Sequence, residues 1–170
     1  MKPLFLLILL VSQINFAYAE NCISKDLFIP KYMVMNGGKE NLDLAFNLLK
    51  PPKVAIKSGE PEFYMSAIKY RQHSPTQSKK FMQQSHDKGF FMSDAFFATA
   101  FYFGLFGYEK NDVKANQYFE QYLEHSKNCD EISDETGKPE TVFALILKIF
   151  DVSKKTLNKK LHPTANASAE

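Results

Sequence analysis

The chain has 170 residues, of which 45% are hydrophobic and 24% charged, enough to build one globular domain with its own apolar core. Its 21 basic and 19 acidic residues nearly balance, and this excludes a strongly basic nucleic-acid-binding domain. Two cysteines are too few for a four-cysteine zinc site or a disulfide-rich scaffold. The totals predict one globular domain and leave its activity open.

The first 19 residues have the layout of a secretory signal peptide. A short basic start, Met1–Pro3, precedes an apolar run from Leu4 to Val11, and a small-x-small sequence ends at Ala19. The alternative is a membrane anchor, but the run is much shorter than the roughly 20 residues that span a bilayer. We therefore predict cleavage after Ala19, and an exported protein, periplasmic or secreted, with no stable membrane span.

Export would place Cys22 and Cys129 in an oxidising compartment, where they can pair. A bridge between them closes a loop of roughly 100 residues, worth on the order of 4–5 kcal/mol in the chain-entropy account. Two isolated thiols or an intermolecular bond are the alternatives. We expect the intramolecular Cys22–Cys129 disulfide.

The chain after residue 19 reads as a series of helices. Residues 20–39, with Pro30 and two glycines, are predicted to form an irregular lead-in. Apolar residues at helical spacing predict helices over residues 41–50, 62–71, 78–88, 93–107, 112–126 and 139–157. Residues 128–137 form an acidic loop, and residues 158–170 a disordered tail. Because no alternating strand pattern appears, we predict one all-α domain over residues 20–157.

The segment from Phe90 to Phe106 is the most apolar of these and holds seven of the 16 phenylalanines. Its rings point all round the helix, as they do in a membrane span or in a helix packed between others. Asp94 and the short uncharged length favour a central packed helix. A third alternative is that some of the rings form an exposed binding surface.

The sequence also contains an internal repeat. Residues 62–70 align with residues 94–102, and residues 81–84 align with residues 118–121. Each alignment pairs one predicted helix with another, so two helix–turn–helix units are present, at about residues 61–89 and 93–126. Units of this kind bury their apolar faces by stacking, so we predict a short α–α solenoid with capping helices on either side.

The second unit resembles the Sel-one-like repeat, a relative of the tetratricopeptide repeat. The matching positions are Tyr102, Gly107, Lys110, Lys114, Ala115, Tyr118 and Phe119. Asn111, Leu105 and Tyr108 depart from the family's pattern. The resemblance implies that Gly107 turns the chain between two helices and that Ala115 lets those helices approach closely. It also implies a concave groove suited to protein binding.

Catalytic signatures are absent from the sequence. It has no phosphate-binding loop, dinucleotide fingerprint, nucleophile elbow or zinc-protease motif. The four histidines, His73, His86, His125 and His162, are not spaced as metal ligands. We predict no catalytic residue, no metal and no cofactor.

These observations favour an exported, non-enzymatic helical-repeat protein that binds an unknown protein partner and no nucleic acid. The candidate contact residues are Tyr64, Lys69, Tyr70 and Phe101. One alternative is a periplasmic inhibitor or immunity-type protein, which binds in the same way and differs only in its partner. A less favoured alternative is a small cell-wall hydrolase using Glu60 or Glu62.

Overall fold

The computed structural model describes residues 24, 27–50, 58–127, 129, 138–153 and 156–158. In these ranges the regular structure is helical and no strand occurs, which confirms the predicted all-α class. The predicted signal peptide, Cys22, most of the acidic loop and the tail after residue 158 lie outside the described residues.

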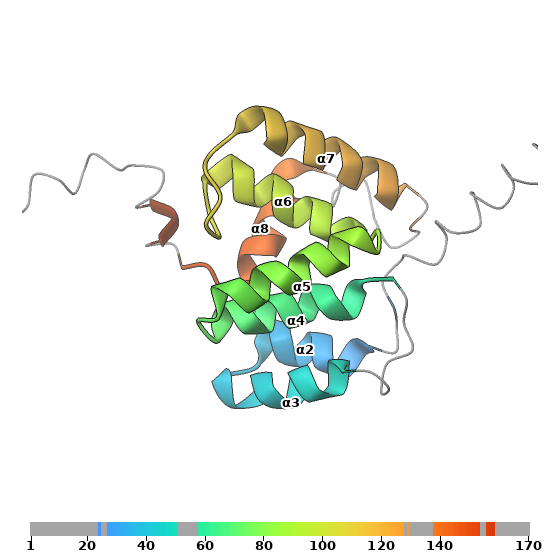
Figure 1. The fold of residues 1–170 in the computed structure, drawn as a ribbon, viewed down its shortest axis with the longest axis vertical. Coiled ribbons are helices and arrows are strands. Elements are labelled where there is room, and N and C mark those ends of the chain that lie inside the picture. Colours follow the sequence, from blue (N-terminus) through green and yellow to red (C-terminus); the bar gives the residue numbers. More distant parts are fainter. Residues whose placement is uncertain are drawn as a thin grey trace, which may run out of the picture.

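Helices that are neighbours in sequence pack against each other in pairs (Figure 1). The pairs are α2 (Phe28–Asn36) with α3 (Lys39–Leu49), α4 (Glu60–Arg71) with α5 (Pro75–Asp87), and α6 (Phe91–Phe103) with α7 (Asp112–Ser126). The α4–α5 pair lies between the other two in Figure 1. The last helix, α8 (Pro139–Ile149), does not continue this order and packs against α6 and α2.

Helix α2 occupies part of the segment that the sequence predicts to be irregular. Pro30 lies in the first turn of this helix, where a backbone N–H has no acceptor within the helix, so proline removes no hydrogen bond there. Gly37 and Gly38 separate α2 from α3. The prediction of an irregular lead-in is therefore wrong for residues 28–36, and a complete helical pair precedes the first predicted unit.

Helix α6 is the centre of the core. Ten consecutive residues, 91–100, are buried, so this helix is covered on every side. This confirms the interpretation of the phenylalanine-rich segment as a packed central helix. Within the described residues, no helix is both long and apolar enough to cross a bilayer.

Two helices end earlier than their periodicity predicts. Helix α6 stops at Phe103, where Gly104 takes a left-handed φ of 63°. Helix α8 stops at Ile149, because Asp151 takes a left-handed φ of 54° and the Val152 N–H bonds back to the Leu147 carbonyl at 2.9 Å. This bond closes the helix in a Schellman motif. The predicted extension of this helix to residue 157 is therefore wrong.

The C-cap of α8, Phe150, is fully buried among rings from three other segments. Its ring centroid lies 4.8 Å from Phe96, 5.2 Å from Phe106, 5.8 Å from Tyr70 and 5.9 Å from Phe63. With these contacts, α8 covers the face formed by the first helices of the three pairs, α2, α4 and α6.

Phe150→Ala is expected to lower the free energy of unfolding by about 3–5 kcal/mol, because it removes a buried ring and leaves a cavity. Chemical denaturation monitored by circular dichroism measures the loss, and Phe150→Leu should show a smaller one. Leu145→Ala, on the exposed side of α8, should change stability by less than about 0.5 kcal/mol. Equal losses for Phe150→Ala and Leu145→Ala would contradict the packing of α8 described above.

Candidate functional site

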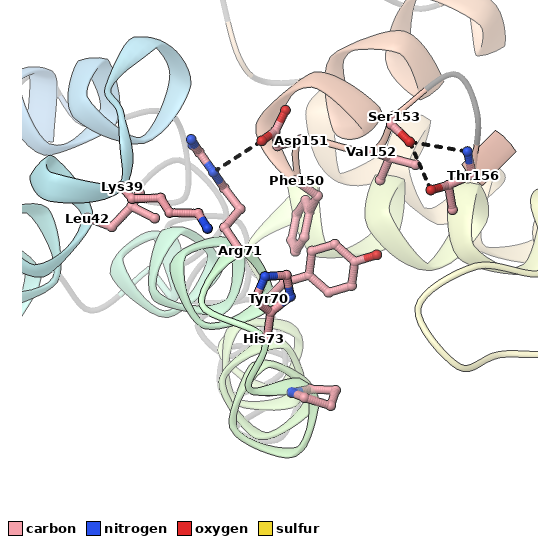
Figure 2. Close-up of a pocket in the computed structure, with 11 residues that line it drawn as sticks. Lys39, Leu42, Tyr70, Arg71, His73, Phe150, Asp151, Val152, Ser153 and Thr156 are labelled. Carbon is pink, nitrogen blue, oxygen red and sulfur yellow. Dashed lines mark hydrogen bonds and ion pairs between the residues drawn. The ribbon is translucent and has the colours of Figure 1, made fainter.

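Two adjoining cavities open where α8 ends, and Figure 2 shows the residues that line the first of them. The first has a volume of about 610 Å³ and the second about 320 Å³. Tyr70, Pro75 and Thr156 line both, so the two cavities lie side by side, and we call the two together the end groove.

The end groove is built from the ends of several helices. Tyr70 lies in the last turn of α4, and Pro75 begins α5. Lys39 begins α3 on the opposite side. Figure 2 shows the Tyr70 and Phe150 rings at the centre, between Lys39 on one side and Thr156 on the other. Because helices must end to make this groove, its lining mixes side chains with exposed turns.

The two halves of the groove differ in chemistry. The first half carries polar and charged side chains, with Lys39, Arg71, His73, Asp151, Ser153 and Thr156 among its lining residues. The second half is mainly apolar, with Phe96, Leu105 and Phe106 on its walls and Lys79 at its edge. Tyr70 joins the halves, its ring 4.9 Å from that of Phe106.

Arg71 fixes the outer wall of the first half. Its guanidinium donates hydrogen bonds to the Val34 carbonyl and, at 3.0 Å, to the Gly37 carbonyl at the end of α2. The Arg71 Nε also lies 4.0 Å from a carboxylate oxygen of Asp151 (Figure 2). This side chain therefore ties the end of α2 to the end of α8.

The backbone of the groove is strained at its rim. Among the described residues, the non-glycine residues with positive φ are His73 (57°), Phe106 (57°) and Asp151 (54°), and all three line the groove. A left-handed conformation costs an ordinary residue roughly 1–2 kcal/mol and costs glycine much less. Residues held in such conformations cluster at functional sites.

The ends of α4, α5, α6 and α8 differ in the residue that takes the left-handed conformation. His73 and Asp151 close α4 and α8 in Schellman motifs, with the Ser74 N–H bonded to the Lys69 carbonyl at 2.9 Å in the first of them. At the ends of α5 and α6, glycine takes the same left-handed role, as Gly89 and Gly104. The ends of α4 and α8 therefore carry side chains where the ends of α5 and α6 use glycine, and Gly104 at the end of α6 also lines the groove.

A separate polar cluster lies between the helical pairs. Asp94 of α6 is 1% exposed. Its carboxylate oxygens lie 3.0 Å from Nδ1 of His86 on α5 and 2.8 Å from Nδ1 of His125 on α7. Burial raises the pKa of the Asp94 carboxyl, and the two imidazoles offset this rise only in part.

This His–Asp–His cluster joins the α4–α5 pair to α6 and α7. The spacing of His86 and His125 in the sequence does not predict that both histidines meet at Asp94. The available signal was Asp94, an acid on an otherwise uncharged helix, because a buried carboxylate requires hydrogen-bonding partners. In the described part of the chain, no group of three or more His, Cys, Asp or Glu residues is placed to hold a metal ion.

Of the four candidate contact residues, Tyr70 is the one that lines the end groove. Tyr64 is buried in the core against Phe63, and burial raises the pKa of its phenol. Lys69 places its Nζ 4.2 Å from the Phe46 ring centroid. Phe101 is half-buried and stacks on Tyr118, with ring centroids 5.8 Å apart.

The residues of the repeat signature lie on and around α7. Gly107 takes a left-handed φ of 78° in the connection from α6, and Ala115 is buried in α7. The Nζ atoms of the exposed Lys110 and Lys114 lie 5.7 Å from the Tyr102 ring centroid and 5.2 Å from that of Phe101, respectively. Tyr118 packs on Phe97, and Phe119 on Phe143 of α8.

The carboxylates considered for a hydrolase are held by lysines outside the groove. Glu60 is fully buried, 2.8 Å from Nζ of Lys31, and accepts a hydrogen bond from the Ser24 N–H. Glu62 accepts a hydrogen bond from Lys88 at 2.6 Å. Both carboxylates therefore take part in ion pairs that connect elements of the fold.

Cys129 is buried, and it is not a free thiol. Cys22 lies outside the described residues. The pairing of these two cysteines therefore stays a prediction.

No protein-family model, no curated protein and no solved structure matches this chain. The Sel-one-like resemblance therefore rests on the residues given above, and the function has to be argued from the geometry of the chain itself.

Asp94→Asn is expected to become more stable, relative to the native chain, as the pH rises from about 4 to 7. The raised pKa means that folded Asp94 holds its proton more tightly than the unfolded chain does. Its contribution to stability is therefore largest at low pH and is lost as the pH rises through the folded pKa. Asparagine keeps the neutral form at every pH.

Thermal unfolding of both chains across this pH range measures the difference. Asp43→Asn, at an exposed position on α3, is the matched control and should show little pH-dependent difference. A stability difference for Asp94→Asn that stays constant with pH, or falls as the pH rises, would refute the proposed effect of burial.

His73→Gly is expected to raise the free energy of unfolding by about 0.5–1 kcal/mol, because glycine relieves the left-handed strain and gives back part of this gain as backbone entropy. Denaturant titration measures the change. Gly89→Ala, which adds a side chain at the equivalent end of α5, should lower stability. A loss of stability in His73→Gly would show that the rim is not strained.

Proposed function

We propose that this chain is an exported, non-enzymatic helical-repeat protein that binds a segment of a partner polypeptide in the end groove. The observation that carries the proposal is the pair of adjoining cavities at the end of α8, whose rim holds His73, Phe106 and Asp151 in left-handed conformations. A fold that keeps side chains in strained positions around one opening gains from their contacts with a ligand.

The position of α8 supports this site over the face expected from stacked helical pairs. Stacked pairs form an extended surface suited to binding, but here α8 packs on α2 and α6 and its C-cap Phe150 packs on α4. The chain itself thus occupies much of the surface formed by the first helices. The end groove begins where this coverage stops, at Phe150 and Asp151.

The order of the helices supports the repeat interpretation. The aligned residues 62–70 and 94–102 lie on α4 and α6, and the aligned residues 81–84 and 118–121 lie on α5 and α7. Equivalent sequence therefore falls on equivalent helices of successive pairs. In this proposal, the α2–α3 pair and α8 are the caps of a short Sel-one-like solenoid.

The lining of the groove suits binding better than acid–base catalysis. Hydrolysis of a glycosidic bond needs two carboxyl groups facing one substrate. Asp151 is the acidic residue among those that line the two cavities, and it lies 4.0 Å from Arg71. Aromatic walls with a few convergent polar groups are instead typical of a recognition site.

Export and the Cys22–Cys129 bridge complete the proposal. Cys129 is buried and is not a free thiol, and both observations support a bridge. Its partner in this proposal is Cys22, the other cysteine of the sequence.

Thr156→Trp should block binding without disturbing the core, because Thr156 is exposed and lines both halves of the groove. Peptides are first selected on the native chain from a displayed random library, and fluorescence anisotropy then gives their dissociation constants. We expect Thr156→Trp to raise these dissociation constants at least about tenfold, which corresponds to about 1.4 kcal/mol of binding free energy.

Thr141→Trp is the matched control, since Thr141 is an exposed threonine on α8 that does not line the groove. It should leave the affinities unchanged. Failure to select any peptide, or equal affinities for Thr156→Trp and the native chain, would overturn the proposed function.

A further inference from the structure

We propose that the end groove selects an acidic peptide segment that carries a carboxylate side chain close to an aromatic or large aliphatic one. This inference rests on the proposed function, since it names the chemistry of the polypeptide that the groove binds.

The charged side chains around the groove favour an anion. Cations line it from three segments, as Lys39, Arg71 and Lys79, and Asp151 is their acidic counterpart among the lining residues. Arg71 and Asp151 lie against each other and largely cancel. Lys39 and Lys79 therefore give the groove a net positive charge.

The helix dipoles around the groove do not reverse its positive charge. The positive ends of α3 and α5 meet the negative ends of α4, α6 and α8 around the groove. Each helix end carries about half an elementary charge, so the one unbalanced negative end is smaller than the charge of the two lysines.

Lys79 is well placed to hold a carboxylate. Its Nζ lies 4.9 Å from the Tyr108 ring centroid and donates a 3.4 Å hydrogen bond to the Gly107 carbonyl. An ammonium group has three donors, so a ligand carboxylate can bind without breaking this contact. Lys39 begins α3 and, among the described residues, forms neither a salt bridge nor a side-chain hydrogen bond.

The sequence around Ser153 and Thr156, the last residues that line the groove, is also rich in positive charge. Ser153 and Thr156 line the groove, and the stretch 153–160 to which they belong contains four lysines and no acidic residue.

The apolar half of the groove sets the second requirement. Phe96, Leu105 and Phe106 line this half, and Phe106 packs on Tyr70, which also faces the charged half. A ligand that covers Tyr70 therefore meets charge on one side and aromatic surface on the other. An extended peptide advances roughly 3.3 Å per residue, so neighbouring or next-neighbouring residues of one segment can occupy both halves.

A peptide fits this arrangement better than an anionic membrane does. The membrane surface is broad and flat, whereas these cations line a cavity together with buried rings. A bilayer would also need a continuous basic face, and this chain is nearly neutral overall.

The test compares peptides that differ in one property. The first carries Asp-Glu-Phe-Leu between glycine–serine flanks, the second replaces the acids by Asn-Gln, and the third replaces Phe-Leu by Ala-Ala. Fluorescence anisotropy against the native chain should show the first binding at least about tenfold more tightly than either other peptide. Equal binding of the Asn-Gln peptide would overturn the inference, as would binding to phosphatidylglycerol vesicles with no binding of the first peptide.

Two lysine variants test whether the groove itself attracts the acidic peptide. Lys39→Gln and Lys79→Gln should each weaken the binding of the acidic peptide by about three- to tenfold. Each should also make this binding less sensitive to salt. Lys114→Gln removes an exposed lysine on α7 outside the groove. It should change neither the affinity for the peptide nor the dependence of that affinity on salt. Equal effects of all three variants would show that overall charge, and not the groove, attracts the peptide.

The outcomes separate this inference from the proposed function. Selected peptides that are weakened by Thr156→Trp but show no preference for acidic residues would overturn the inference and leave the binding groove intact. Peptides that are insensitive to Thr156→Trp would overturn both.

Discussion

The packing of Phe150 is the interaction on which the rest of the structure depends. This ring is fully buried, and it contacts Phe63 and Tyr70 from one helical pair and Phe96 and Phe106 from the next segment along the chain. Burying one phenylalanine contributes on the order of 2–3 kcal/mol from apolar area alone. The contact anchors α8 over the first helices of the pairs and fixes the point at which it must end.

The groove follows from the same contact. Past Phe150 the chain turns away through Asp151, and the surface that α8 no longer covers is lined by Tyr70 and Phe106. The rings that hold the helix down are therefore also the floor of the opening. This explains why a chain that fills its own helical face still presents an aromatic cavity to solvent.

Polar groups divide between two roles in this fold. Asp94 is buried and bound by His86 and His125, and together they join three helices inside the molecule. Arg71 and Asp151, by contrast, lie at the groove and hold its wall. The groove rim keeps His73, Phe106 and Asp151 in left-handed conformations, next to Gly104 and Gly107, which take the same conformation in the same lining. The rim gives up stability through its backbone, and the internal cluster gives up stability through the burial of a carboxylate.

Local patterns in the sequence predicted those parts of the fold that depend on neighbouring residues. The spacing of apolar residues placed α7 at its observed bounds, Asp112–Ser126, and identified α6 as the central helix. Helix α2 was missed because Pro30 looks like a helix breaker, although proline is harmless in a first turn. The end of α8 was missed because an aspartate in the left-handed conformation leaves no sequence signal comparable to glycine.

The site was harder to predict because its residues are distant in sequence. Its walls come from residues 39 and 42, from 70–75, and from 150–153 and 156, with 78, 79, 96 and 104–107 on the apolar side. Helix periodicity says which face of each helix is buried, but not which helix ends meet. Tyr70 was predicted as a candidate contact because it lies on the leading helix of the first repeat unit. Its partners Phe106 and Phe150 belong to segments that only the packing of α8 brings together.

Hydrogen–deuterium exchange with and without a bound acidic–aromatic peptide tests the central claim most directly. That claim is that α8 is a fixed part of the core and that ligands bind beyond its end. The account predicts slower exchange on binding at residues 70–75, 104–107 and 150–156, with exchange in α8 unchanged. Faster exchange in α8 on binding would contradict it, because the ligand would then be displacing this helix from the face that it covers.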